Sequence, residues 1–152
     1  DKVDERYNVE LATKAACVFI NDLYRRFGNW TLTAAAYNGG AGRISKELKA
    51  QKVSNFYDLY LNAETSKYVF RILAIKEVMS DPESFGYDIE RVNMYKPIQV
   101  SQRLTIDTSI TSLTNFAISN GTTYKMLRYM NPWITDRDLP VAAGKSYEIL
   151  IP

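Results

Sequence analysis

The sequence predicts an α+β protein, with a mainly α-helical first part over residues 1–92 and a small strand–helix–helix–strand module over residues 93–152. Two observations predict the first part: apolar residues recur every three or four positions, and glycine or proline ends the periodic stretches. The third observation is a change of character near Asn93, after which Tyr, Val, Ile and Thr, which suit pleated sheet, become frequent. A length of 152 residues allows one or two small domains.

The first predicted helix spans residues 9–27, where apolar side chains form one stripe at helical spacing. Gly28–Asn29 follows it and is a typical stop. A second helix is expected to begin with Thr31 as its N-cap, because a threonine oxygen can accept a hydrogen bond from the first helical turn. The run Asn38–Gly39–Gly40 ends this helix.

Two more helical segments are expected before the change of character. Residues 44–50 form a short amphipathic stretch, and residues 56–61 suggest an apolar turn. Residues 64–79 form a long helical pattern, which Ser80–Asp81–Pro82 ends because proline cannot continue a helix.

The tail shows a strand–helix–helix–strand order. Residues 95–110 have strand composition, residues 110–119 show a helical stripe, and Asn120–Gly121 is a turn signal. A second short helix is expected over residues 124–130, and a closing strand over residues 147–151. We place the boundary between the two parts between Tyr87 and Tyr95.

Composition excludes several classes of chemistry. The chain has no histidine, which excludes Ser–His–Asp and Cys–His nucleophiles. It has a single cysteine, Cys17, which excludes an intrachain disulfide and a Cys-rich zinc site; its small neighbours predict a core position. The net charge of +2 does not indicate nucleic acid as a partner. The sequence contains no run of about 18 apolar residues, the length that would predict a membrane-spanning helix.

Tyr37 and Asn38 are the first candidate site residues. They stand at the end of a helix of small residues, just before a glycine turn that allows positive φ angles. A tyrosine beside an amide suits a sugar, because the pair offers a ring face together with a donor and an acceptor. A plain helix C-cap and tight turn is the alternative, and composition alone favours it.

Glu64 and Tyr68 are the second candidate pair. Their i, i+4 spacing makes them neighbours on one helical face, where they can hydrogen-bond to each other at the wall of a cleft. In the alternative, which spacing alone favours, Glu64 is a first-turn carboxylate that the helix dipole stabilises and Tyr68 is a core residue.

Several motifs in this order carry a resemblance to a known family. They are Asp4-Glu5-Arg6, a helix ending in Phe27-Gly28-Asn29-Trp30, Ala35-Ala36-Tyr37-Asn38-Gly39-Gly40 and Glu64-Thr65-Ser66-Lys67-Tyr68-Val69. With these motifs, residues 4–87 resemble the later part of a lytic transglycosylase of the goose-lysozyme-like, or soluble lytic transglycosylase-like, group. The resemblance implies that residues 1–92 form an incomplete lysozyme-like lobe.

The tail resembles a divergent LysM module, a peptidoglycan-binding unit. Ser112-Leu113, Gly121-Thr122-Thr123, Asn131-Pro132 and the ending Ile151-Pro152 carry this resemblance. The sequence departs from the pattern before the first helix of the module, where Asp107-Thr108 is only a partial counterpart of the usual Gly-Asp-Thr turn.

The resemblance implies cleavage of the β-1,4 bond between N-acetylmuramic acid and N-acetylglucosamine, with a 1,6-anhydro product. One glutamate acts as both acid and base, and no metal or cofactor is needed. The implied partners are peptidoglycan glycan strands, and the implied location is the periplasm or cell envelope of a bacterium, compatible with an outer-membrane anchor outside this sequence.

In this family the catalytic glutamate stands upstream of the counterpart of Asp4-Glu5-Arg6, so we expect no catalytic residue in this chain; Glu5 and Glu10 fall at non-catalytic positions. Tyr37, Asn38, Glu64 and Tyr68 are carried over as substrate-binding residues. The start without Met indicates a processed or truncated chain, and we expect an apolar face that a missing segment would cover. The alternatives are a non-catalytic peptidoglycan-binding module and an unrelated helical interaction protein.

Overall fold

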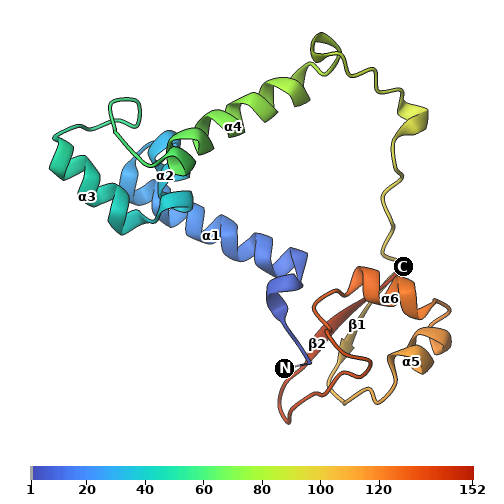
Figure 1. Cartoon of the computed structure of the whole chain (residues 1–152). Helices are drawn as coiled ribbons and strands as arrows, with labels where there is room; N and C mark the ends of the chain where they lie inside the picture. The colour runs from blue at the N-terminus through green and yellow to red at the C-terminus, as the bar shows by residue number, and fades with distance from the viewer. Residues whose placement is uncertain (1) are drawn as a thin grey trace. The chain divides into compact units, whose positions relative to one another are not determined.

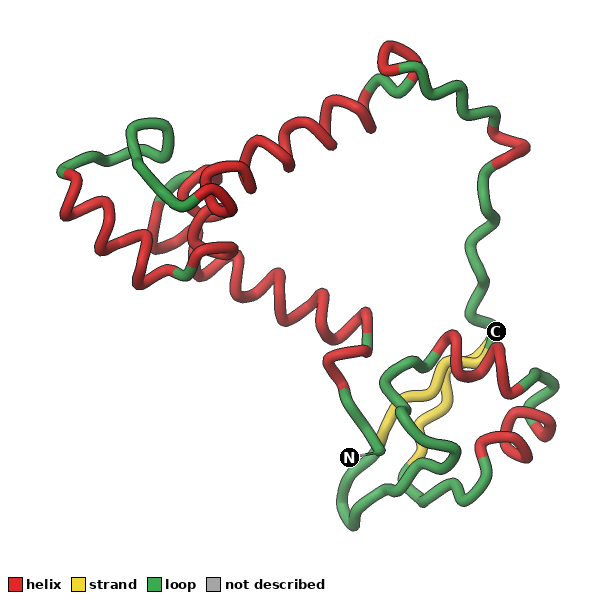
Figure 2. The backbone as a smooth tube through the Cα atoms, viewed as in Figure 1, coloured by secondary structure: helices red, strands yellow, loops and turns green. Residues whose placement is uncertain are grey.

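The computed structural model describes residues 2–152, apart from the side chain of Arg91. It forms two compact units, which we describe separately: residues 16–95, and residues 2–15 together with residues 96–152 (Figures 1 and 2). The α-helices are α1 Val9–Phe27, α2 Trp30–Gly39, α3 Ala41–Gln51, α4 Ala63–Ser80, α5 Leu113–Ser119 and α6 Tyr124–Met130. The strands are β1 Gln102–Ile106 and β2 Tyr147–Ile151. These elements confirm the predicted α+β class, and the boundary predicted at residues 92–93 stays a prediction.

The helical unit is built around α2, which packs against both α3 and α4. Small residues on α2 allow this, because Ala35 and Ala36 are fully buried and let neighbouring backbones come close. The segment between α3 and α4 has no helix of its own, yet Phe56, Leu59 and Leu61 from it are buried in the same core. This confirms the predicted apolar turn.

The N-cap of α2 corrects one prediction. Asn29, and not Thr31, caps the helix: the Asn29 Oδ1 accepts a hydrogen bond from the backbone N–H of Leu32 at 2.9 Å. Thr31 lies inside the first turn, where its hydroxyl donates to the same Asn29 oxygen at 3.0 Å. The helix therefore begins as soon as the Gly28 turn ends, because asparagine is itself a strong cap.

The burial of α1 also differs from expectation. Of its predicted apolar stripe, Leu23 is buried, whereas Val9 is 71% exposed and Phe19 is 50% exposed. Cys17 is exposed, so the prediction of a core cysteine was wrong. The physical reason is that only the C-terminal part of α1, at Leu23 and Phe27, packs into the core of the helical unit, so Val9 and Cys17 lie outside it.

The tail unit is a two-stranded antiparallel sheet covered by short helices. β1 pairs with β2 so that Leu104 lies opposite Ile149. The core of the unit consists of Leu113, Ala117, Leu127, Trp133, Ile134, Leu139, Ile149 and Ile151. The strand predicted over 95–110 is shorter in the structure. The helix predicted from residue 110 begins at Leu113, because Ser112 caps it and Ile110 forms a β-bridge with Leu139.

Asn131 ties the end of α6 to β2. It is completely buried, and its Nδ2 donates to the carbonyl oxygens of Leu127 at 2.9 Å and Leu150 at 2.7 Å. Its Oδ1 accepts the backbone N–H of Leu150 at 2.8 Å. The amide thus satisfies both backbone groups of one β2 residue, as a neighbouring strand would. Within residues 2–152, none of the helices has the length and apolar character needed to cross a membrane.

Candidate functional site

The four predicted site residues meet where α2 ends and α4 begins. Tyr37 and Asn38 occupy the last turn of α2, and Glu64 and Tyr68 occupy the first two turns of α4. Gly40 follows α2 with a φ of 88°, a backbone conformation that glycine adopts readily, and it turns the chain into α3.

A close approach between two backbones brings these residues together. A Cβ atom on Gly39 would lie 2.9 Å from the Oγ1 and 3.0 Å from the Cγ2 of Thr65. The missing side chain at residue 39 is therefore what allows α2 to pack so closely on α4, with Thr65 buried between them.

Asn38 and Glu64 form the polar half of the site. The Asn38 Nδ2 donates a hydrogen bond to the Glu64 Oε1 at 3.3 Å. The hydrogen bond of Glu64 thus goes to Asn38 on the other helix, and not to Tyr68 on its own helix as the i, i+4 spacing suggested. The Glu64 side chain is exposed and Asn38 is half-buried, so both can reach a ligand.

Tyr37 and Tyr68 form the aromatic half. They line one hollow of about 120 Å³, together with Ile20, Trp30, Thr33, Ala34 and Ile72. The Tyr37 ring also lies 6.0 Å from the ring of Phe19, and Trp30 stacks on Tyr24 with ring centroids 4.4 Å apart. The hollow is therefore a mainly apolar surface with three aromatic side chains, those of Trp30, Tyr37 and Tyr68, which suits the C–H face of a sugar ring.

Sequence reasoning did not assign a role to Trp30 or to Gly39. Trp30 is 60% exposed on the hollow, and its signal was its place in the motif Phe27-Gly28-Asn29-Trp30. Gly39 positions the site although it carries no side chain. The sequence feature that could have revealed Gly39 is the pair of glycines at positions 39 and 40. The turn needs only Gly40, so a glycine at position 39 indicates a second requirement, a close contact.

No acid stands in the aromatic hollow. Its lining residues include no Asp or Glu, and Glu64 lies outside the lining. Over the described part of the chain, no group of His, Cys, Asp and Glu residues is arranged to hold a metal ion. The chemistry available at these residues is thus hydrogen bonding by Asn38 and Glu64 and ring contact by the tyrosines.

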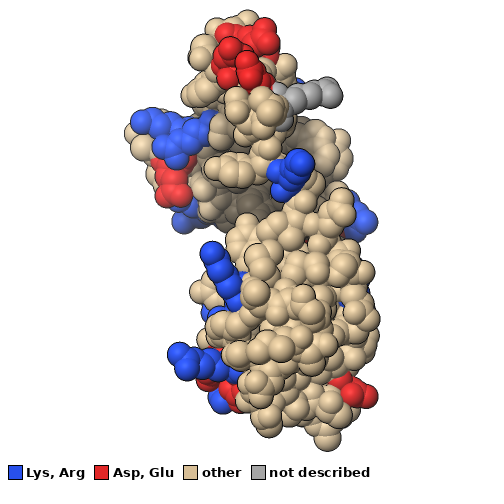
Figure 3. All heavy atoms as spheres, turned by 90° about the vertical axis from the view of Figure 1, so that its right-hand side faces the viewer, with Lys and Arg blue, Asp and Glu red and all other residues tan. Residues whose placement is uncertain are grey.

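The tail presents a surface of a different kind. Figure 3 views the molecule from the side on which α5 lies in Figure 1, and the middle of the lower half of that face shows no charged side chains, which stand instead at its left and right edges. The sequence agrees, because residues 108–124 contain no Lys, Arg, Asp or Glu. Such a surface does not have the basic character of a nucleic-acid site.

Comparisons with known proteins match the two parts of the chain separately. Residues 1–59 match the family model of the transglycosylase SLT domain, and residues 102–152 match that of the soluble lytic transglycosylase C-terminal LysM-like domain. Two curated relatives are each 31% identical to this chain over 113 residues, which cover 65% of this chain and 25% of the relative. Both are named membrane-bound lytic murein transglycosylase D, from Escherichia coli strains K12 and O6:H1.

The chain thus spans about a quarter of the length of the curated relatives that it matches. The motif pattern of residues 4–87 also predicted a resemblance to the protein of this name. The two family models and these relatives confirm the resemblance: the chain is similar to soluble lytic transglycosylases in residues 1–59 and to their LysM-like C-terminal domain in residues 102–152.

Proposed function

We propose that this chain is the sugar-binding part of a peptidoglycan lytic transglycosylase. The single observation that carries the proposal is the meeting of Tyr37, Asn38, Glu64 and Tyr68 at the contact between α2 and α4. The match of residues 1–59 to a transglycosylase family model supports it, and so does the name of the curated relatives.

In the proposed reaction, the enzyme cleaves the β-1,4 bond between N-acetylmuramic acid and N-acetylglucosamine. One glutamate protonates the leaving oxygen, and the same group then takes the proton from the C6 hydroxyl of the muramoyl residue as that oxygen attacks the anomeric carbon. The product is a 1,6-anhydro sugar, and no water is consumed. The resemblance to the family implies that this glutamate stands upstream of the counterpart of Asp4-Glu5-Arg6, and we propose the same position here.

The residues of this chain have distinct proposed roles. The Tyr37 and Tyr68 rings pack on the sugar, and the Tyr68 hydroxyl lies near the catalytic carboxyl group. Asn38 hydrogen-bonds the sugar, and Glu64 holds the amide of Asn38 in position through their 3.3 Å bond. These roles are binding and positioning, since a single acid/base carries the proton transfers.

The tail is proposed to bind peptidoglycan glycan strands. Its match to a LysM-like family model and its charge-free surface over residues 108–124 support a neutral polymer as ligand. A location in the bacterial cell envelope follows for a protein with this substrate, and the relatives' name "membrane-bound" supports it. The boundary near residues 92–93 is the proposed division between the two activities.

A second function is binding without cleavage. The observation in its favour is that no Asp or Glu lines the aromatic hollow. In that case the chain holds glycan at both the α2–α4 contact and the tail, and releases no product.

The experiment that separates the two functions measures anhydro-muropeptides released from purified sacculi by the full-length protein. Tyr68→Phe and Asn38→Ala are each expected to lower the initial rate about tenfold, as the loss of a hydrogen bond of about 1.4 kcal/mol predicts. Tyr60→Phe is the matched control, because Tyr60 is 87% exposed and does not line the aromatic hollow. Equal rates for all variants would remove these residues from the site, and absence of anhydro products from wild type would leave the binding function.

A further inference from the structure

A second hollow, of about 240 Å³, lies within the tail unit, where residues 5–14 meet the start of β2. Glu5, Asn8 and Lys14 come from the N-terminal side. Trp133, Ser146 and Tyr147 come from the tail. The hollow therefore has two walls that are far apart in the sequence.

Backbone pairing holds the N-terminal wall in place. Val3 forms an antiparallel bridge with Ile134. The Asp4 N–H donates to the Trp133 carbonyl at 2.8 Å, and the Thr135 N–H donates to the Lys2 carbonyl at 2.9 Å. Residues 2–4 thus pair with the loop that follows α6 through one antiparallel bridge and the backbone hydrogen bonds on either side of it.

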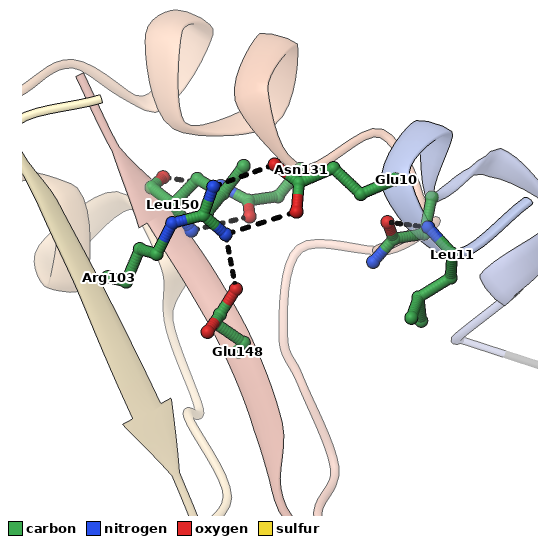
Figure 4. Close-up of polar contacts among 7 residues, drawn as sticks. Glu10, Leu11, Arg103, Asn131, Glu148 and Leu150 are labelled. Atoms are coloured by element: carbon green, nitrogen blue, oxygen red, sulfur yellow. Dashed lines mark hydrogen bonds and ion pairs between the residues drawn. The ribbon is translucent and has the colours of Figure 1, made fainter. Parts of the chain in front are cut away.

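Arg103 fixes two carboxylates of the hollow. Its Nη2 lies 2.7 Å from the Glu10 Oε1, and its Nη1 lies 2.6 Å from the Glu148 Oε1 (Figure 4). This guanidinium holds the pKa of Glu10 below its usual range. Both carboxylates line the hollow, and Arg103 orients them from its two walls.

The charges around the hollow nearly compensate. Three negatively charged side chains, Glu5, Glu10 and Glu148, and two positively charged ones, Lys14 and Arg103, lie at the hollow. Among the described residues no ion pair involves Glu5, so its carboxylate can accept a hydrogen bond from a ligand, whereas the charge of Lys14 acts on Glu10 and helps to lower the pKa of that carboxyl. A small excess of one charge favours a neutral polar ligand over a strongly charged one.

The tail wall adds an aromatic surface. The rings of Trp133 and Tyr147 lie 5.3 Å apart at 32°, and Trp133 is buried, so it supports the half-buried Tyr147 from behind. An aromatic face next to amide, hydroxyl and carboxylate groups suits a pyranose, which has an apolar C–H face and a polar rim. The volume is below the roughly 300–1,000 Å³ of pockets for drug-sized ligands, so the hollow fits a single sugar residue.

We propose that this hollow is a saccharide site that binds one neutral sugar residue of a glycan, with residues 5–14 as one of its walls. The choice of ligand rests on the proposed function. The site itself goes beyond the LysM-like family model, whose match begins at residue 102 and includes only the tail wall.

The test is a titration of the full chain with a soluble β-1,4-linked tetramer of N-acetylglucosamine, followed by amide NMR shifts. Saturable shifts are expected at Asn8, Lys14, Ser146 and Tyr147. Ser146→Trp fills the hollow and is expected to weaken binding at least about tenfold, which corresponds to about 1.4 kcal/mol. Ala142→Trp is the matched control, because Ala142 is exposed and does not line the hollow.

A conservative variant tests the free carboxylate. Glu5→Gln removes the charge but keeps the shape, and a weakening of about 2–10-fold is expected, as for the loss of one hydrogen bond. Glu83→Gln is its control, since Glu83 is exposed and stands in another unit.

Several results would overturn the proposal. They are the absence of saturable binding at millimolar tetramer, wild-type affinity in Ser146→Trp, equal weakening in Ser146→Trp and Ala142→Trp, and tighter binding of the cationic glucosamine tetramer. The titration measures binding without turnover. It can therefore fail while the Tyr68→Phe assay succeeds, and the reverse.

Discussion

The helical unit and the tail differ in how their helices are covered. α4 has 18 residues, yet only Thr65 and Val69 in its first two turns are buried among the described residues. α5 and α6 have 7 residues each, and they bury Leu113, Ala117 and Leu127. The short helices α5 and α6 are thus closely packed in the tail, whereas most of the long helix α4 is exposed in the helical unit.

Exposed apolar side chains mark the open part of α4. They include Phe70, Ile72, Leu73, Ile75 and Met79, with Met79 at 77% exposure. The comparison teaches that the core of the helical unit holds α4 only by its first two turns, through the contact with α2, while the tail has a closed core with a buried polar link. Three substitutions sharpen that contrast.

The largest effect is expected in the tail from Asn131→Ala. The substitution leaves the N–H and the carbonyl of Leu150 without their partner in a buried place. Unsatisfied buried groups of this kind each destabilise by about 1–3 kcal/mol, so unfolding of the tail should become easier by about 2–4 kcal/mol. Urea unfolding followed by tryptophan fluorescence measures this, in a Trp30→Phe background so that Trp133 is the fluorophore that reports on the tail.

Asn115→Ala is the matched control for that measurement. Asn115 is exposed on α5, and its side chain makes no hydrogen bond within the described part of the molecule, so a change within about 0.5 kcal/mol is expected. A small effect for both variants would mean that the tail core does not depend on the Asn131 network.

A smaller effect is expected in the helical unit from Gly39→Ala. The new Cβ would stand 2.9 Å from the Thr65 Oγ1, and the two helices must separate to relieve the contact, which destabilises by about 1–3 kcal/mol. Gly42→Ala is the control in α3, because a Cβ there meets nothing within 4 Å and alanine favours helix by up to about 1 kcal/mol. Thermal unfolding followed by circular dichroism compares the two.

A second substitution tests whether the contact with Thr65 causes the destabilisation by Gly39→Ala. Thr65→Ala removes the Oγ1 and Cγ2 atoms that a residue-39 Cβ would meet, and the remaining Cβ lies at an ordinary 3.5 Å. The double variant Gly39→Ala/Thr65→Ala should therefore be more stable than the sum of the two single changes predicts. Strict additivity would show that the close approach of α2 and α4 is not what Gly39 provides.

Periodicity predicted the regular elements well. The helix over residues 9–27 and the strand over residues 147–151 have the predicted ends, because an apolar pattern and a glycine stop act locally. Thr31 failed as a cap because Asn29 is a stronger cap and stands nearer the Gly28 turn. Cys17 failed as a core residue because its burial depends on a partner for α1, which local sequence does not specify.

The sequence predicted which four residues form the site, but it did not predict which of them contact each other. Asn38 and Glu64 are 26 positions apart, and their hydrogen bond exists because Gly39 and Thr65 let two helices touch. The i, i+4 pattern could pair Glu64 only with a residue of its own helix. The hollow beside Tyr147 was missed for the same reason, since Arg103 joins Glu10 and Glu148 across the sequence.

The smallest effect is expected from Glu10→Gln, as a change in pH dependence. The hydrogen-bonded Arg103 lowers the pKa of Glu10 in the folded chain, so the native state binds this proton less readily than the unfolded chain does. The pair therefore stabilises the fold above the usual carboxyl range near pH 4. That contribution is lost as the pH falls through the lowered pKa.

Removing the carboxylate should make the stability of the tail unit less sensitive to acid between about pH 5 and pH 2. The melting temperature of wild type and Glu10→Gln measured across that interval checks this, with Asp22→Asn as control for an exposed pair within one helix. Because Glu10 and Arg103 are both about half exposed, salt should shrink the difference. An acid slope that is the same in Glu10→Gln as in wild type would mean that this ion pair does not hold residues 5–14 to β1, and the backbone pairing of residues 2–4 with the loop after α6 would then be what keeps this segment on the tail.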